Sequence, residues 1–288
     1  MRLIDTHTHA WAPNTNELPW KADVLPPEWE GPYTASQLIG DMDRASVDES
    51  VIVTTPLYGR GPRANEYTMR SISAYPDRLY GVGLVPYFKS EETMRDAVAR
   101  VVGNERMLGV RMHAPFVYDE IPTELDPTAD WILSKKLTPV WEEIESRNKS
   151  VFIFPKAAQI SMIGTLAERH PDVPIVVDHM AWPDEETDAD ESPWADFRSV
   201  SDHDNVYVKL SSLPRSADSP WPYPDLHDYV RNLLEWFGPD RLMLGSDYPW
   251  MDSWAEYGQC LSWIEEAEFV SARDLSYLSY RTFDTLHR

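Results

Sequence analysis

Short apolar runs alternate along the chain with segments whose apolar residues recur at helical spacing. Eight runs have the length of β-strands: Leu3–Thr6, Ser50–Thr54, Tyr80–Pro86, Leu108–Met112, Val151–Phe154, Ile175–Val177, Val206–Leu210 and Leu242–Gly245. Helical spacing occurs near residues 34–46, 62–75, 91–102, 131–148, 158–169, 193–201, 224–237 and 254–268. A final helix is predicted over residues 271–285, with Ser271 as its N-cap and Asp274 three residues later.

Strands that are apolar throughout and separated by helices are typical of a parallel sheet covered by helices. Eight such units predict an α/β fold of the (β/α)8 TIM barrel type, in one domain over residues 1–288 with an additional C-terminal helix. An open doubly wound sheet is the alternative, but no glycine-rich turn follows the first strand. In a barrel, the loops after the strands form the active-site face. Those richest in Pro, Trp and polar residues cover 11–32, 58–62, 115–130, 182–193 and 214–224.

Charge and composition narrow the range of partners. Lys and Arg number 26 against 48 Asp and Glu, which gives a net charge of −22. No basic stripe is visible, so neither nucleic acid nor an anionic membrane surface is expected as a partner. No run of 18 apolar residues and no secretory leader is found, so a cytoplasmic location is expected. The one cysteine, Cys260, excludes an internal disulfide and a cysteine zinc cage. Oligomeric state is not indicated.

Lysine is scarce, with 7 Lys against 19 Arg. A strongly acidic, lysine-poor surface stays hydrated when salt has screened ordinary charge repulsion. We therefore expect a halophilic protein whose stability rises with salt concentration.

Titratable side chains collect at the ends of four predicted strands. Strand alternation places His7 and His9, together with Asp5, on one face of the first strand. Two imidazoles one pleat apart can chelate a divalent cation or hold an anion. The sixth strand ends at His179 and the eighth at Asp247. The fourth strand carries two further basic side chains, Arg111 and His113.

These motifs, in this order, resemble the amidohydrolase superfamily. The branch is the amidohydrolase-related one that includes sugar lactonases, 2-pyrone-4,6-dicarboxylate lactonase and some decarboxylases. The resemblance spans nearly the whole chain and rests on Asp5-Thr6-His7-Thr8-His9, on the stretch from His170 to Met180, on Asn205–Ser211 and on Gly238–Pro249. It implies a (β/α)8 barrel whose catalytic residues are His7, His9, His179 and Asp247.

One departure from that family concerns the metal. Zinc-bearing members usually carry a ligand, most often His, at the end of the fifth strand, where this chain has Phe154 and Pro155. His7, His9 and Asp247 could still supply the three protein ligands that a catalytic zinc needs. One divalent metal, Zn or Mn, and a metal-independent site therefore both stay open.

Further residues are predicted to bind a small-molecule substrate that is anionic or sugar-derived. Arg111 either pairs with an internal acid or clamps a substrate carboxylate. Lys209 is predicted to lie inside the barrel and to pair with Asp5. The remaining candidates follow strand ends as cationic or aromatic wall residues: His113, Lys156, Trp11, Trp182, Tyr248 and Trp250.

Hydrolysis of a lactone is the predicted function. Asp247 would activate water, and His179 with the first-strand pair, or an ion held there, would stabilise the oxyanion. A lactone is more electrophilic than an amide, so it suits a site without a firmly held metal. Metal-dependent decarboxylation of an aromatic or unsaturated acid is the second interpretation. A catalytically silent binding barrel is the third.

Overall fold

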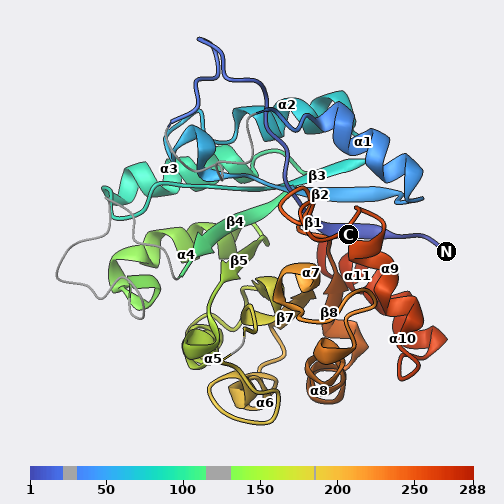
Figure 1. Cartoon of the computed structure of the whole chain (residues 1–288). Helices are drawn as coiled ribbons and strands as arrows, with labels where there is room; N and C mark the ends of the chain where they lie inside the picture. The colour runs from blue at the N-terminus through green and yellow to red at the C-terminus, as the bar shows by residue number, and fades with distance from the viewer. Residues whose placement is uncertain (22–30, 115–130, 185) are drawn as a thin grey trace.

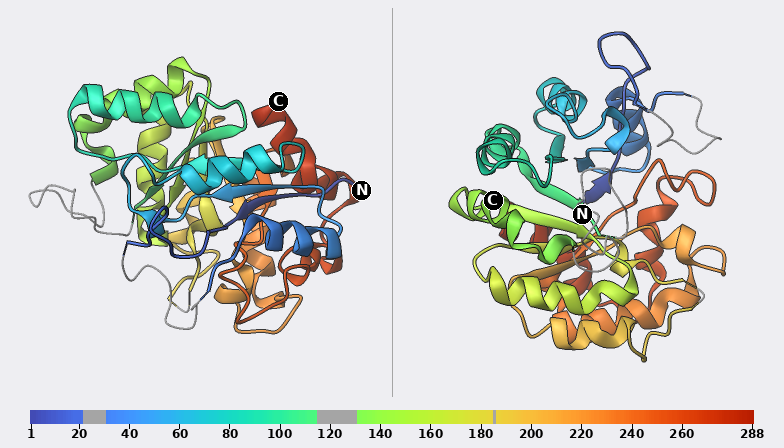
Figure 2. Two further views of the ribbon diagram at one scale, coloured as in Figure 1. Left: turned by 90° about the horizontal axis from the view of Figure 1, so that it is seen from above. Right: turned by 90° about the vertical axis from the view of Figure 1, so that its left-hand side faces the viewer.

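The computed structural model describes residues 1–21, 31–114, 131–184 and 186–288. Eight strands form one sheet in the order in which they occur along the chain, and each strand from the first to the eighth pairs in parallel with the next. Helices surround the strands (Figure 1; Figure 2, right). The strands are β1 (Ile4–Thr8), β2 (Glu49–Val53), β3 (Leu79–Gly83), β4 (Met107–His113), β5 (Ser150–Phe154), β6 (Ile175–Val177), β7 (Val206–Leu210) and β8 (Leu242–Leu244). The predicted TIM barrel is confirmed.

The barrel closes between its first and last strands. A parallel bridge joins Thr8 to Tyr248 just beyond β8, and the backbone N–H of Asp247 donates to the carbonyl of His7 at 2.8 Å. The backbone N–H of His9 donates to the carbonyl of Tyr248, also at 2.8 Å. Closure therefore sets the ends of β1 and β8 side by side, although they are more than 230 residues apart in sequence.

The helices agree with the predicted segments except in a few places. They are α1 (Ala35–Arg44), α2 (Glu66–Ala74), α3 (Glu91–Val102), α4 (Thr138–Ser146), α5 (Ile160–Arg169), α6 (Phe197–Val200), α7 (Leu213–Ser216), α8 (His227–Phe237), α9 (Gln259–Ser262), α10 (Ala272–Ser276) and α11 (Thr282–His287). The segment predicted over 131–148 begins with two 3-10 turns, and α4 starts only at Thr138, with Pro139 in its first turn. Proline suits that position because its missing N–H has no acceptor there.

The helix predicted over 254–268 is mostly wrong. Residues up to Gly258 form turns, α9 is four residues long, and a 3-10 turn follows it. Ala255 and Tyr257 are buried while Glu256 between them is exposed. Two residues that are two positions apart lie on different faces of a helix, so Ala255 and Tyr257 could not both be buried on one helix face. Tertiary packing therefore overrides the apparent helical pattern.

The C-terminal helices close the bottom of the barrel. Ser271 caps α10 as predicted, with its Oγ accepting from the backbone N–H of Asp274, and a π-helical turn joins α10 to α11. From α11, Phe283 packs among side chains of the strands that point into the barrel: Ile4, Val51, Val53, Tyr80, Val82, Leu108, Phe152, Val176 and Met243. Both chain termini lie at this end (Figure 2, left). The site must therefore open at the other end.

None of the helices in the described ranges is both long enough and apolar enough to span a bilayer. Of the loops singled out in the sequence, residues 22–30, 115–130 and 185 lie outside the described residues.

Candidate active site

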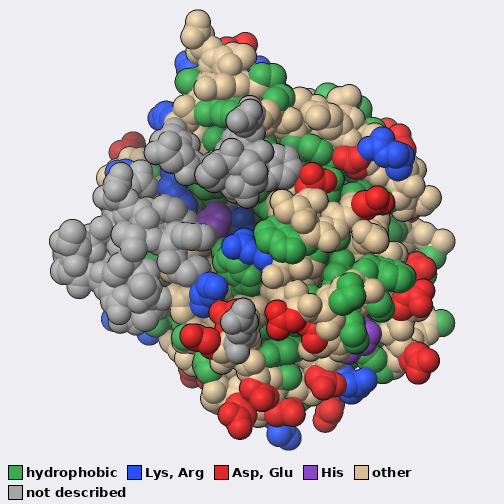
Figure 3. Space-filling model, in the orientation of Figure 1, with side chains coloured by type: hydrophobic (Ala, Val, Ile, Leu, Met, Phe, Trp, Pro, Cys, Tyr) green, Lys and Arg blue, Asp and Glu red, His purple; other side chains and the backbone are tan. Residues whose placement is uncertain are grey.

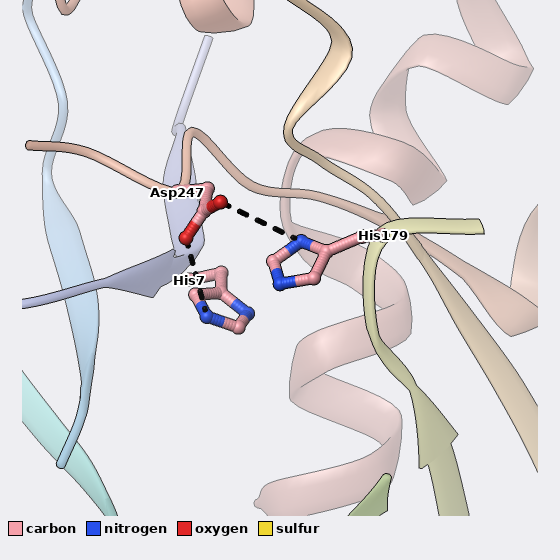
Figure 4. A group of neighbouring side chains, drawn as sticks. All are labelled: His7, His179 and Asp247. Atoms are coloured by element: carbon pink, nitrogen blue, oxygen red, sulfur yellow. Dashed lines mark ion pairs between the residues drawn. The ribbon is translucent and has the colours of Figure 1, made fainter. Parts of the chain in front are cut away.

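Four predicted catalytic side chains meet at the ends of β1, β6 and β8. The Asp247 carboxylate is their centre: its Oδ1 lies 3.1 Å from His9 Nε2 and 3.7 Å from His7 Nε2. Its Oδ2 lies 4.0 Å from His179 Nδ1 (Figure 4). All four residues are buried. The geometric expectation from the sequence, that these strand ends converge on one point, is met.

The backbone is strained where these side chains emerge. Asp247 has φ of 63°, and His179, Met180, Ala181 and Trp182 form a consecutive run with φ between 52° and 59°. A side chain with a Cβ in this left-handed region costs about 1–2 kcal/mol per residue. Such strain is typical of functional sites, where the surrounding structure imposes the conformation.

The inner nitrogens of the first-strand histidines both have polar neighbours. His9 Nδ1 lies 2.7 Å from the carbonyl oxygen of Val53, which can only accept, so Nδ1 carries a hydrogen. His7 Nδ1 lies 3.2 Å from Oδ1 of Asp178 and is hydrogen-bonded to Nζ of Lys209 at 3.4 Å. Both rings therefore turn their Nε2 atoms towards Asp247. His7 Nε2 has no hydrogen-bond partner among the described residues, as expected of an atom that faces a bound ligand.

Arg111 lies below this group and pairs with an internal acid. Its Nε donates to Oδ2 of Asp178 at 2.8 Å, its Nη1 donates to Nε2 of His113 at 2.9 Å, and its Nη2 donates to Nε2 of His179 at 3.3 Å. Of the two alternatives predicted for Arg111, the structure therefore contains the pair with an internal acid, Asp178. A guanidinium with these three acceptors is held rigidly beneath the mouth of the barrel.

The predicted Lys209–Asp5 pair is wrong. Lys209 Nζ lies 3.2 Å from Oδ1 of Asp178. Asp5 instead accepts from the backbone N–H and the hydroxyl of Ser246, at 2.9 and 2.6 Å, and from the backbone N–H of His7. The register of β1 on β2 shifts between Asp5 and Thr8, so simple alternation does not carry Asp5 to the face of His7.

Burial dominates the electrostatics of the site. It lowers the pKa of His179 to about 4 and that of His7 well below its ordinary value, so both rings are neutral near pH 7. Burial alone would raise the pKa of Asp247. That pKa is nevertheless held below its usual range by the ring of His179, which is protonated at the acid pH where Asp247 titrates, and by the hydrogen bond with His9 Nε2 at 3.1 Å. The centre is therefore an ionised carboxylate among imidazoles.

A divalent cation fits part of this arrangement. Ligand atoms of His7, His179 and Asp247 all lie within 4.8 Å of one another. The set predicted from the sequence contained His9 in place of His179. Metal-bound imidazoles usually donate their second N–H to an acceptor, as His9 does here to the carbonyl of Val53. At the end of β5, Phe154 offers no ligand, and its ring packs edge-on against His179 at 5.1 Å between centroids.

The predicted wall residues divide into two groups. Trp182 and Lys156 lie at the rim, with Lys156 Nζ 3.9 Å from the centre of the Trp182 ring. Trp11 is fully buried and stacks on Trp250, whose ring lies 5.6 Å from that of His9. Tyr248 packs in an aromatic cluster with two other tyrosines, and its hydroxyl donates to Asp252. His113 is buried beside Arg111.

Two arginines near the mouth were missed in the sequence. Arg215, in α7 after β7, has its guanidinium carbon 3.9 Å from the centre of the Trp182 ring. Arg60, in the loop after β2, is buried and lies over the Tyr87 ring. The sequence did offer a signal for them. Each is a basic residue in a segment that follows a strand, and basic residues are a minority in a chain of net charge −22. Figure 3 shows Lys or Arg side chains and a histidine together in a hollow, whereas acidic side chains gather on the lower part of that face.

A parallel (β/α)8 barrel with histidines and an aspartate at the C-terminal ends of its strands has the layout of a TIM-barrel enzyme. The family model for amidohydrolases, Amidohydro_2, matches residues 4–276, and the chain belongs to this family. The predicted membership is thereby confirmed.

Named relatives cover most of the chain. An L-fucono-1,5-lactonase of Burkholderia ambifaria is 26% identical over 271 residues, which are 91% of this chain and 87% of the relative. A 4-sulfomuconolactone hydrolase of Rhizobium radiobacter is 23% identical over 257 residues, covering 85% and 75%. A crystal structure from Acinetobacter baumannii, described as a probable 2-pyrone-4,6-dicarboxylic acid hydrolase, superposes with a TM-score of 0.79 at 18% identity, covering 100% of this chain and 99% of the other.

Neutral buried histidines make stability depend on pH. The folded pKa of His179, about 4, lies below its ordinary value of 6.5, so the unfolded chain takes up a proton first as the pH falls. His179 alone should lower the free energy of unfolding by about 3 kcal/mol between pH 6.5 and 4. Other buried histidines act in the same direction. Chemical denaturation of wild type and His179→Gln measures this: the variant should lose stability less steeply in that window, with parallel curves above pH 7. Parallel curves throughout would contradict the assignment.

Proposed function

We propose that this protein opens a small lactone that carries an anionic substituent. The observation that carries the proposal is the position of the Asp247 carboxylate at the mouth of the barrel, 3.1 Å from His9 Nε2, 3.7 Å from His7 Nε2 and 4.0 Å from His179 Nδ1. Two relatives named for lactone hydrolysis, at 26% and 23% identity, support the same reaction. Asp247 accepts a proton from water as that water attacks the lactone carbonyl carbon.

The histidines supply the remaining groups. His179 Nδ1 lies 2.9 Å from Ser211 Oγ and 4.0 Å from Asp247, and its ring can donate an N–H to the oxyanion that forms. After the C–O bond breaks, Asp247 returns its proton to the leaving alkoxide. The low pKa of Asp247 favours this second transfer, because a carboxyl group that binds its proton weakly gives it up readily.

If a divalent ion binds, His7, His179 and Asp247 are the residues that would hold it. When bound, it would polarise the lactone carbonyl and lower the pKa of a coordinated water. The protein's own residues also provide a base and an N–H donor, so hydrolysis has a route that uses only side chains.

An anionic substrate is supported by the charges at the rim. Lys156 and Arg215 both contact the Trp182 ring at 3.9 Å. No salt bridge of Arg215 occurs within the described part of the chain, whereas Lys156 is 3.9 Å from Asp184. Arg60 adds a third cation near His113. A carboxylate or sulfonate on the lactone would pair with the guanidinium of Arg215 at this rim.

The first test removes the proposed base. Asp247→Asn should lower kcat/KM for lactone hydrolysis by about 10³-fold, because the amide cannot accept a proton from water. Asp240→Asn, which changes an exposed acid at the opposite end of β8, is the matched control and should keep full activity. Thermal melting should show both variants folded. Turnover at the wild-type rate by Asp247→Asn would refute the role of this carboxylate.

The second test concerns substrate charge. Arg215→Gln should raise KM about tenfold for lactones that bear a carboxylate, because one charged contact is lost, and should leave KM for neutral lactones unchanged. Arg231→Gln is the control, since Arg231 lies on α8 and pairs there with Asp228. Assays at low ionic strength avoid screening of the effect. An equal change of KM for charged and neutral lactones would show that Arg215 does not read substrate charge.

The third test separates hydrolysis from metal-dependent decarboxylation. We expect lactone hydrolysis to survive prolonged treatment with a chelator, because the side-chain route needs no ion. Metal content measured before and after treatment is the control. Loss of activity that added Zn or Mn restores would assign an essential ion, and decarboxylation of aromatic acids by that metal-loaded protein would favour the other function.

A further inference from the structure

Two buried cations lie behind the imidazoles of the active site, and each contacts the ring nitrogen that does not face Asp247. Nζ of Lys209 is hydrogen-bonded to Nδ1 of His7 at 3.4 Å. Nη2 of Arg111 is hydrogen-bonded to Nε2 of His179 at 3.3 Å. Both cationic side chains lie inside the barrel, almost out of reach of solvent. None of the steps of lactone hydrolysis described above uses either of them.

The chemistry of the two cations fixes the direction of both hydrogen bonds. An ammonium and a guanidinium donate hydrogen bonds and have no lone pair with which to accept one. His7 Nδ1 and His179 Nε2 must therefore accept. Each ring is neutral near pH 7, because burial lowers the pKa of both histidines, and a neutral imidazole carries one ring hydrogen. That hydrogen consequently lies on Nε2 in His7 and on Nδ1 in His179.

These two nitrogens are the ones that face the reacting centre. His7 Nε2 lies 3.7 Å from Oδ1 of Asp247, and His179 Nδ1 lies 4.0 Å from its Oδ2 and 2.9 Å from Oγ of Ser211 (Figure 4). Each ring is a dipole in the field between the cations and the Asp247 carboxylate. The field favours a lone pair turned to the cation and an N–H turned to the carboxylate. His7 Nε2 has no hydrogen-bond partner among the described residues, so its N–H is available to a ligand.

Asp178 defines the competing arrangement at His7. Its Oδ1 lies 3.2 Å from His7 Nδ1 and would accept from that nitrogen if the ring hydrogen were there. In the part of the chain that the structure describes, however, Asp178 Oδ1 takes part in no hydrogen bond. Its carboxylate is instead paired with both cations, with Nε of Arg111 at 2.8 Å and Nζ of Lys209 at 3.2 Å. Asp178 therefore balances the charge of the two cations that contact the rings.

We propose that Lys209 and Arg111 are positioning residues that set the ring hydrogens of two imidazoles, so that His7 and His179 both present an N–H to the reacting centre. The inference rests on the proposed function for the use of these N–H groups, but not for where the hydrogens lie. In lactone hydrolysis, the two N–H groups would both donate to the oxyanion. Donors that are oriented before charge develops need no reorganisation in the transition state.

Nitrogen NMR of chelator-treated protein labelled with 15N at histidine locates the hydrogens without any substrate. The protonated and unprotonated nitrogens of a neutral ring resonate far apart, and spectra of His7→Gln and His179→Gln assign the signals. In wild type at neutral pH, His7 should carry its hydrogen on Nε2 and His179 on Nδ1. A hydrogen on His7 Nδ1 or on His179 Nε2 would overturn the proposal, whether or not any lactone is hydrolysed.

Lys209→Met tests the cause. Without the ammonium, His7 Nδ1 loses its donor and faces only the Asp178 carboxylate, so the His7 hydrogen should move to Nδ1 while that of His179 stays in place. Lys149→Met is the matched control, because it removes a half-buried ammonium that donates to a backbone carbonyl, and it should leave both hydrogens where they are. A His7 hydrogen that remains on Nε2 in Lys209→Met would show that Lys209 only stabilises the barrel interior.

Kinetics provide the second readout. On a lactone that Asp247→Asn fails to hydrolyse, Lys209→Met should lower kcat about 10²-fold with KM within about threefold of wild type, as expected when one of two oxyanion donors is lost. Lys149→Met should keep the wild-type kcat. An increase in KM alone would assign Lys209 to substrate binding and contradict the proposal. If Lys209→Met does not fold, the wild-type spectrum still decides where the hydrogens lie.

Discussion

Closure of the barrel between β1 and β8 is the constraint on which the site depends. Two backbone hydrogen bonds of 2.8 Å join His7 and His9 to Asp247 and Tyr248, so the proposed catalytic carboxylate and the histidine pair are fixed by main-chain pairing. Asp5 strengthens the same seam by accepting from Ser246. Gly245 allows the close approach, because a Cβ there would come within 2.9 Å of the Cβ of His7.

The second requirement is charge balance inside the barrel. Asp178 and Asp247 bring two negative charges into a buried site, and Arg111 and Lys209 bring two positive charges, while burial keeps the rings of His7 and His179 neutral. A buried charge is tolerated when paired and hydrogen-bonded, and removing one partner is far more costly than keeping the set. The four charged side chains of this cluster therefore form a unit, and the loss of any one of them would leave another charge buried without its partner.

The protein as a whole is strongly negative, whereas the rim of its barrel carries basic side chains. An anionic lactone approaching a chain of net charge −22 is repelled at long range, whereas Lys156 and Arg215 attract it at the rim. Salt screens exposed charges beyond about 8–10 Å at moderate ionic strength, and more strongly at higher concentration. Screening therefore removes the repulsion first and leaves the short contacts at the mouth, which suits the high-salt setting that the lysine-poor composition predicts.

Periodicity and strand parity by themselves determined the barrel and placed His7, His9, His179 and Asp247 at its rim, because apolar runs mark parallel strands and strand ends share one face. Asp178, Arg60 and Arg215 were missed because their importance lies in partners contributed by other strands and loops. Only the tertiary structure decided that Lys209 pairs with Asp178, since the register shift in β1 turns Asp5 to another neighbour. The local sequence pattern shows which residues stand at the strand ends. The partner of each of these side chains depends on the register between strands, which no local pattern reports.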